Sequence, residues 1–556
     1  MLLKSRFPPL PPLPEVNIHH VMFGRPNQAD WSDYTFQIDE KTGRKRTFEE
    51  MKQRIGLGAT ALGANVADGG LGLRGDGHEM VGLLGFNSME YFDIVHSLLM
   101  ITTPFALISA YATRFELVHA LKLTKATRLF VDVGVLEHVL AAIDVADVHI
   151  ELEHVYVLAG SPPDGWKSFG DMIDIVRDKK VTLEPVRPAQ QDTLAYLVMS
   201  SGTSGFPKAV MITHGNAIGS ILQSMVVGKA SARASRRRAS SMPIALAVLP
   251  MFHSYGLHGY ILRATLWRAT FVIMDKWDTA RYLECIPKYR VTQLTLIPSA
   301  IHQLVTHPDT KTTDLRSVEY ISCGAAHLPP ALAKRFSHLL LKSSEISPSY
   351  GLSETTLSAV TLPIAGMLGM GAPPPHATGL LVPGLDARIV HDDGSDAAPG
   401  EPGELWLRGC TVTPGYWNDA QANSDAFVDG WFRTGDQFRA DDQGYLLCDT
   451  LKISGVQVSP KEIEDVLLAH PEKLISDVSV AGVSGGRTED EKVPRAWVVL
   501  SAAGKDKDTS AVIGALEAWH QESLSKYKWL RGGIEIVEEL PKTPTGKTIR
   551  RVLPAG

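Results

Sequence analysis

The sequence contains little cysteine and no long apolar run. Its four cysteines, among 556 residues, show no Cys-x-x-Cys spacing, so neither a zinc site nor a disulfide framework is indicated. No uninterrupted apolar stretch of about 18 residues occurs, which argues against a transmembrane helix. The closely spaced prolines between Met1 and Pro14 exclude the apolar helix of a signal peptide. We therefore expect a protein of a reducing compartment.

An excess of basic residues is also missing. The chain carries 55 Lys and Arg against 61 Asp and Glu, a formal net charge of −6, whereas nucleic-acid-binding proteins usually have a basic excess. The last residues do not form the Ser-Lys-Leu peroxisomal address. These features predict a cytoplasmic protein whose partners are not nucleic acids.

The length of the chain requires more than one hydrophobic core, so at least two domains are expected. Apolar strands alternate with amphipathic helices, which predicts an α/β fold in which helices pack on parallel or mixed sheets. One such helix is expected over about residues 47–64, with Thr47 as its cap and Glu50 three residues on. After Asp449 the pattern changes to a compact α+β unit. We therefore predict an N-terminal domain over residues 1–449 and a C-terminal domain over residues 450–556.

The most informative segment is the Gly/Ser-rich run Ser200 to Lys208. Glycines and small residues let backbone N–H groups approach an anion closely, and hydroxyls and the lysine add further donors. The run follows an apolar stretch that reads as a strand and precedes a helical segment over 216–227. Gly202 and Gly205 lie too close together for the loop of P-loop NTPases. A polyphosphate site is favoured over a ligand-free loop.

Further motifs make this loop interpretable. In chain order they are Leu249-Pro-Met-Phe-His-Ser-Tyr255, Ile321-Ser-Cys-Gly-Ala-Ala-His327, Tyr350-Gly-Leu-Ser-Glu354, Gly403-Glu-Leu-Trp-Leu-Arg-Gly409, Gly415-Tyr-Trp417, Gly430-Trp-Phe-Arg-Thr-Gly-Asp436, Gly455-Val-Gln-Val-Ser-Pro460 and Pro541-Lys-Thr-Pro-Thr-Gly-Lys547. The set resembles the adenylate-forming superfamily, which includes acyl-CoA synthetases, adenylation domains of peptide synthetases and luciferase. Its 4-coumarate–CoA ligase-like branch is the most similar. The resemblance runs from about Thr47 to Val552.

The resemblance implies a two-step reaction with ATP, Mg²⁺ and coenzyme A. A carboxylate attacks the α-phosphate of ATP to give an acyl-adenylate and pyrophosphate, and a thiol then displaces AMP. It also implies a distorted β-barrel in the large domain and a small, mobile C-terminal domain that rotates between the two steps.

The same resemblance assigns the phosphate and metal contacts. Glu354 and Thr203 would hold Mg²⁺, because hard oxygen ligands suit that ion. Ser353 would reach the α-phosphate. The loop that grips the β- and γ-phosphates would consist of Ser200, Ser201, Gly202, Thr203, Ser204, Gly205 and Lys208.

Adenosine contacts are implied further along the chain. Tyr350 would lie against adenine and Asp436 would accept hydrogen bonds from the ribose hydroxyls. Backbone atoms at the adenine edge and beside the substrate would come from Gly324, Ala325, Ala326 and Gly351.

Catalysis would depend on the C-terminal domain. Lys547 would stabilise the negative charge that builds up during adenylation, and His253 would lie between the carboxylate and thiol tunnels. Gly455 would leave room for a pantetheine arm, with Lys452 and Gln457 near the carboxylate-side pocket and phosphate.

One segment departs from the family pattern. After Asp449 about four residues of the hinge are missing, the family arginine is replaced by Thr450 and a lysine by Ser454. We expect from this a restricted rotation and weak thioester formation, unless the gap is an error of the gene model.

Two substrates have more than one candidate, namely the carboxylic acid and the acceptor of the acyl group. The residues Tyr255, Gly256, Gly259, Cys323 and Gly324 predict a slot that suits a phenylpropanoid or a medium-chain fatty acid equally. The acceptor is either CoA or a separate phosphopantetheinyl carrier protein, and a non-catalytic nucleotide-binding protein is the third alternative. We expect a monomer or a weak homodimer.

Overall fold

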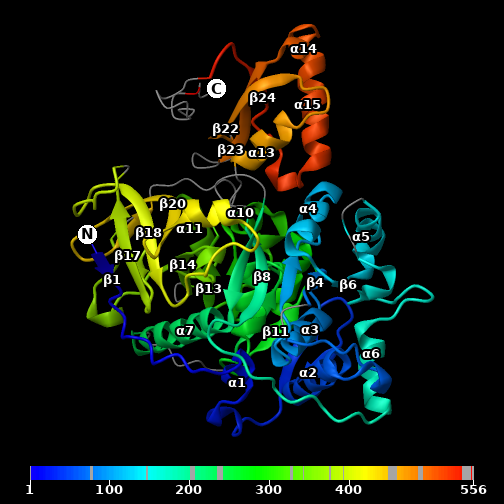
Figure 1. The fold of residues 1–556 in the computed structure, drawn as a ribbon. Helices are drawn as coiled ribbons and strands as arrows, with labels where there is room; N and C mark the ends of the chain where they lie inside the picture. Colours follow the sequence, from blue (N-terminus) through cyan, green and yellow to red (C-terminus); the bar gives the residue numbers. More distant parts are fainter. Residues whose placement is uncertain are drawn as a thin grey trace.

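The computed structural model describes most of the chain. The described residues are 2–75, 79–145, 148, 150–200, 207–234, 242–325, 328, 330–341, 344–374, 377–391, 393–448, 460–485, 492–540 and 553. Figure 1 shows a large body that contains three sheets and a smaller C-terminal unit next to helix α4 (Arg114–Thr124). The predicted boundary between residues 449 and 450 lies outside the described residues.

The first sheet carries both ends of the Gly/Ser-rich run. Its order is β7-β6-β4-β5-β8-β9, parallel except for the antiparallel pair β8–β9. The strands are β4 (Val81–Leu84), β5 (Phe105–Ile108), β6 (Arg128–Val131), β7 (Val155–Val157), β8 (Leu194–Ser200) and β9 (Lys208–Thr213). Ser200 pairs directly with Lys208, so both ends of the run are fixed at one edge of the ladder.

The second sheet has nine strands and a parallel centre. Its order is β16-β15-β14-β13-β12-β10-β11-β2-β3. The strands are β2 (Thr35–Asp39), β3 (Lys45–Thr47), β10 (Ile244–Ala247), β11 (Thr270–Ile273), β12 (Gln293–Leu296), β13 (Tyr320–Cys323), β14 (Glu345–Tyr350), β15 (Val360–Thr361) and β16 (Leu380–Leu381). The strand ends at Cys323 and Tyr350 lead directly into two of the predicted site segments.

The third sheet is antiparallel and stands where a distorted barrel was expected. It joins β1 (Leu2–Lys4), β17 (Leu385–Val390), β18 (Gly403–Gly409), β20 (Trp431–Ala440), β19 (Phe427–Val428) and β21 (Leu446–Cys448). Among the described residues its edge strands β1 and β19 do not pair with each other, so the sheet is a half-barrel. This open half-barrel agrees with the expected distorted barrel, and the predicted α/β architecture is confirmed.

Helices fill the space between the first two sheets. Helix α2 (Phe48–Gly63) begins as predicted at Thr47, whose hydroxyl accepts from the Glu50 N–H while the Glu50 carboxylate accepts from the Thr47 N–H. It packs on α3 (Met89–Met100) and α6 (Phe169–Asp178). One apolar cluster combines Phe92 of α3 with Val198 of β8 and Phe271 of β11, which joins both sheets into one body.

The predicted helix over 216–227 is longer than expected. It is part of α7 (His214–Ala234), and the six residues before it form strand β9 rather than loop. No helix among the described residues is long and apolar enough to cross a membrane.

The C-terminal unit has a sheet and a core of its own. Strands β22 (Ile475–Ser484), β23 (Lys492–Leu500) and β24 (Ile534–Ile536) form the sheet, and helices α13 (Pro460–Leu468) and α15 (Thr509–Ser523) contribute to a separate apolar cluster. The α+β prediction for this part is confirmed.

Candidate active site

The carboxylate of Glu354 is held by two hydroxyl groups. Its Oε1 accepts a hydrogen bond of 2.8 Å from Ser200 Oγ and one of 3.0 Å from Tyr416 OH. Glu354 lies on the short 3-10 helix η7 (Ser353–Thr355), is 4% exposed and lines a large cavity. No hydrogen bond to the second oxygen, Oε2, comes from the described residues. An acidic oxygen at a cavity wall fits a Mg²⁺ ligand.

Lys208 lies beside the same group. Its Nζ is 4.8 Å from the centre of the Tyr416 ring, a cation–π distance. Because Ser200 pairs with Lys208 and donates a hydrogen bond to Glu354, both ends of the Gly/Ser-rich run lie near Glu354. Tyr416 belongs to the motif Gly415-Tyr-Trp417, but no local pattern indicates that its hydroxyl reaches a residue more than sixty positions away.

The loop that carries Glu354 has a strained backbone. Thr356 has φ of 55° and Leu357 has φ of 113°, both in the region that side chains rarely adopt. A Cβ added to Gly351 would lie 1.6 Å from the Leu357 carbonyl oxygen, so only glycine fits there. Strain of this kind is maintained where the surrounding structure requires one geometry.

Ser353 contacts Ser254, the residue that follows His253 in the chain. Ser254 Oγ lies 3.0 Å from Ser353 Oγ, and His253 caps the helix α8 (Ser254–Leu257) by accepting from the Tyr255 N–H through Nδ1. His253 is surrounded by protein, yet its side chain faces the cavity and is accessible there. Burial lowers the pKa of His253, which keeps the imidazole neutral at pH 7.

Tyr350 and Asp436 form a direct pair. The Tyr350 hydroxyl donates a hydrogen bond of 2.7 Å to Asp436 Oδ2, and both residues are buried, with Asp436 only 1% exposed. Burial and the neighbouring carboxylate raise the pKa of Tyr350 well above its usual value. The two predicted adenosine contacts therefore lie side by side, on β14 and β20.

The cavity has a volume of about 910 Å³, at the upper end for a small-molecule site. Tyr255, Gly324 and Ala325 line it as predicted, and Ala325 has a positive φ of 68°. Gly256, Gly259 and Cys323 are not among its lining residues. Gly256 packs against the backbone of Pro250, and Cys323 belongs to the apolar core behind the sheet.

The C-terminal unit also reaches the cavity. Lys528, on the 3-10 helix η9 (Lys526–Lys528), places Nζ 2.7 Å from Oε1 of Glu116 in α4 and 2.7 Å from Oε1 of Glu462 in α13. Ser525 Oγ donates to Glu116 Oε2 at 2.6 Å. Glu116, Ser525 and Lys528 all line the cavity. No pattern in the sequence singled out this cluster.

Several predicted residues cannot be placed. The altered hinge after Asp449 lies outside the described residues. So do ten of the predicted site residues, which are Ser201, Gly202, Thr203, Ser204, Gly205, Ala326, Lys452, Gly455, Gln457 and Lys547.

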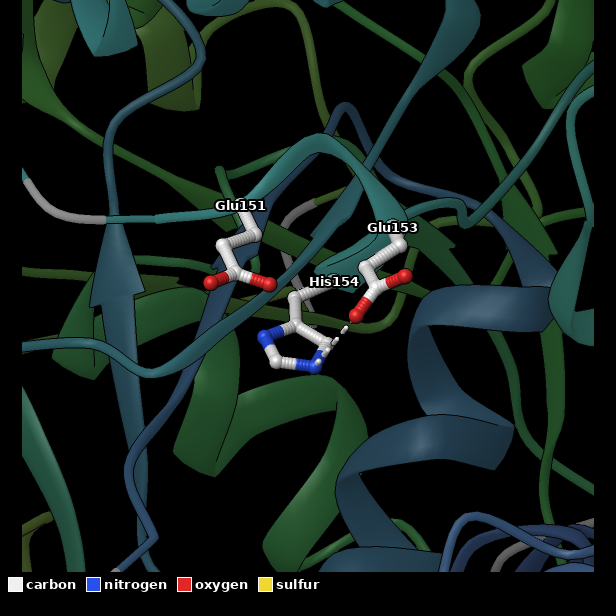
Figure 2. Close-up of side chains that lie close together, drawn as sticks. All are labelled: Glu151, Glu153 and His154. Atoms are coloured by element: carbon white, nitrogen blue, oxygen red, sulfur yellow. Dashed lines mark ion pairs between the residues drawn. The ribbon is translucent and has the colours of Figure 1, made fainter.

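One further group of side chains has the composition of a metal site. Figure 2 shows Glu151, Glu153 and His154 close together, with an ion pair of 3.9 Å between Glu153 and His154. The two glutamates are exposed to solvent and the group lies on the short 3-10 helix η4 (Leu152–His154) and the residue before it. Exposed acidic groups are common without a metal, and we assign this one no role.

Comparison with known protein families gives two matches that together cover most of the chain. The model of the AMP-binding enzyme family matches residues 25–417. The model of the AMP-binding enzyme C-terminal domain matches residues 462–547.

Individual relatives match between about two thirds and nearly all of this chain. The acyl-CoA ligase AFT1-1 of Alternaria alternata is 28% identical over 94% of this chain and 90% of its own. A probable 4-coumarate–CoA ligase of Dictyostelium discoideum is 30% identical over 65% of this chain and 62% of its own. Among solved structures, an o-succinylbenzoate CoA synthetase of Bacillus subtilis has a TM-score of 0.73 at 22% identity, covering 96% of this chain and 97% of its own, which supports the fold.

Proposed function

Because the chain belongs to the AMP-binding enzyme family, we propose that it activates a carboxylic acid as an acyl-adenylate at the Glu354 cavity and transfers the acyl group to coenzyme A. It is an AMP-forming acid–thiol ligase. The observation that carries the proposal is that Ser200 and Glu354 meet at one wall of the cavity, with Lys208 paired to Ser200 in the neighbouring strand.

The first half-reaction needs charge compensation. A carboxylate oxygen forms a bond to the α-phosphorus of ATP, and the bond from that phosphorus to the oxygen of the leaving pyrophosphate breaks. Lys208 and the backbone of the Gly/Ser-rich run would hold the phosphates, and Glu354 would hold a Mg²⁺ ion that offsets their negative charge. Ser200 and Tyr416 orient the Glu354 carboxylate through Oε1, so that its other oxygen can bind the ion.

The nucleoside would be bound by residues of β14 and β20. Tyr350 would lie against adenine, and Asp436 would accept hydrogen bonds from the ribose. The hydrogen bond between them fixes the Asp436 carboxylate before ATP arrives. Backbone groups at Gly324, Ala325, Ala326 and Gly351 would complete the site.

The second half-reaction requires an open path for a thiol. The sulfur attacks the acyl carbon, the acyl–oxygen bond breaks, and AMP leaves with that oxygen. His253, neutral and facing the cavity, would lie on this path, and Gly455 with Lys452 and Gln457 would border the pantetheine arm. Lys547 would serve the first half-reaction only.

The proposal is tested by pyrophosphate release with ATP, Mg²⁺ and a panel of aryl, medium-chain and long-chain acids. Acid-dependent release is expected. Its absence over the whole panel would favour the non-catalytic alternative. Comparing CoA with a holo-carrier protein as acceptor separates a CoA ligase from an acyl-AMP ligase that loads a carrier.

A variant separates the two half-reactions. Lys547→Ala should abolish adenylation and leave the thiolation of a supplied acyl-adenylate intact. Equal loss of both would contradict two separate uses of the C-terminal domain. Thioester formation at a rate similar to adenylation would overturn the expectation of an impaired hinge after Asp449.

A further inference from the structure

We propose that Arg263 is the distal anchor of the acid pocket and binds a second carboxylate, so that the preferred substrate is a dicarboxylic acid. The inference rests on the proposed function, since it names the acid that the ligase activates. It goes beyond that function because nothing in the reaction itself requires a second acidic group.

Arg263 lines the same cavity as Glu354 and His253, at the far end of the helical segment that begins after His253. It directly follows the π-helix η5 (His258–Leu262), which continues α8, and it lines the cavity together with His253 and Tyr255. About ten residues of helical backbone separate His253 from Arg263, which is on the order of 15 Å. An acid that reacts near His253 would therefore extend its other end toward the guanidinium.

The guanidinium has only neutral partners among the described residues. Its Nη2 donates to Ser220 Oγ at 2.8 Å and to the Ser220 carbonyl oxygen at 3.2 Å, and its Nε is buried without a hydrogen-bond partner. No described carboxylate lies within ion-pair distance of it. By contrast, the buried Arg46 forms an ion pair of 2.8 Å with Asp93.

The described groups in hydrogen-bond contact with Arg263, and the partners of those groups, are neutral. Tyr196 OH lies 2.9 Å from His258 Nε2, and Ser220 Oγ donates to the Thr356 carbonyl oxygen at 3.0 Å. Burial lowers the pKa of His258 well below its usual value and raises that of Tyr196, so both are neutral at pH 7. Arg263 itself keeps its charge, because burial lowers its pKa only to about 10.

An enclosed cation that lacks a counter-charge is costly unless a ligand supplies one. The cavity wall next to Arg263 also offers the polar groups of Gln223 and Ser224 on α7. A carboxylate fits this arrangement because a guanidinium can donate two parallel hydrogen bonds to it. The simpler alternative is that Arg263 only braces α7 through Ser220.

The test uses matched pairs of acids with the purified full chain. Straight-chain α,ω-dicarboxylic acids, their ω-hydroxy analogues and the corresponding monocarboxylic acids are compared by pyrophosphate release over a series of chain lengths. We expect kcat/KM for the preferred diacid to exceed that of its monoacid by on the order of 10²-fold, with the ω-hydroxy acid between them.

Two variants locate the effect at the guanidinium. Arg263→Met should remove the preference for the diacid and leave the monoacid within a few-fold, whereas Arg263→Lys should retain part of it. The matched control is Arg25→Met, because the hydrogen-bond partners of Arg25 among the described residues are likewise neutral, the carbonyl groups of Thr265 and Leu266, but Arg25 does not line the cavity. Its selectivity should equal that of the unchanged protein.

The outcomes separate this inference from the proposed function. Release with monoacids and no preference for any diacid would overturn the role of Arg263 while the ligase activity stands. Absence of release with every acid would contradict the proposed function, and calorimetry of diacid against monoacid binding would then decide on Arg263 alone. If Arg263→Met does not fold, Arg263→Gln, which can still donate to Ser220, replaces it in the same comparison.

Discussion

Lys528 of the C-terminal unit places its Nζ 2.7 Å from Oε1 of Glu116 in the large domain. A second carboxylate, that of Glu462, lies at the same distance from the same nitrogen. All three side chains are buried. Two carboxylates thus share one ammonium across the contact between the domains, next to helix α4 (Figure 1).

This cluster predicts a pH-dependent contact. Burial raises the pKa of Glu462 to about 7, and Lys528 only partly opposes this, whereas the pKa of Glu116 is lowered by Lys528 and Ser525 against the effect of its burial. A raised folded-state pKa contributes stability that is complete below the usual pKa near 4.5 and is lost as the pH rises toward 7. The contribution of Glu462 to folding stability should therefore decrease between about pH 5 and pH 7.

The measurement is the free energy of unfolding across that range. We expect a decrease on the order of 3 kcal/mol at most. Glu462→Gln should flatten the slope, because an amide does not titrate, and Glu472→Gln on the exposed surface should not. If the free energy of unfolding of Glu462→Gln depends on pH as strongly as that of the unchanged protein, the titrating group is not Glu462.

Glu354 should be required for the adenylation step. Glu354→Gln removes the charge that would hold Mg²⁺, so kcat for pyrophosphate release should fall by about 10²-fold or more. Tyr416→Phe removes one of the two hydroxyl donors and should cost only about 1–2 kcal/mol in the same assay. Glu151→Gln, at an exposed glutamate, serves as the control. Full activity of Glu354→Gln would exclude the metal assignment.

Gly351 should not tolerate a side chain. A Cβ there would lie 1.6 Å from the carbonyl oxygen of Leu357, so Gly351→Ala must displace the loop that carries Glu354. We expect destabilisation of about 2–4 kcal/mol and loss of activity. Gly514→Ala is the control, because a Cβ in that helical position meets nothing within 4 Å and should be neutral or slightly stabilising. Similar melting temperatures for the two variants would contradict the strained geometry.

The Tyr350–Asp436 hydrogen bond should affect ATP rather than the acid. Tyr350→Phe keeps the ring but leaves the buried Asp436 without this donor, so the KM for ATP should rise severalfold to tenfold while the KM for the acid stays unchanged. Tyr445→Phe, in a different apolar cluster, should change neither value. A change in the KM for the acid alone would mean that adenine binds elsewhere.

The capping signal at Thr47 and the alternation of apolar segments predicted most helices and strands correctly. These patterns are local, and the helix capped by Thr47 begins where the pattern indicates. The start of α7 and the strand β9 were missed because a strand of six residues directly followed by a helix leaves no turn residues between them. Pocket residues were the least predictable, since Gly256 and Cys323 turned out to pack against backbone and core.

The sequence by itself determined the family, the order of the motifs and the chemistry of the phosphate run, because those depend on residue types at fixed local spacing. Only the tertiary structure decided which side chains meet. It joined Tyr416 to Glu354, Lys528 to Glu116, and left Arg263 in the cavity with no carboxylate among the described residues. Such contacts arise from strands and helices far apart in the chain, and no local pattern records them.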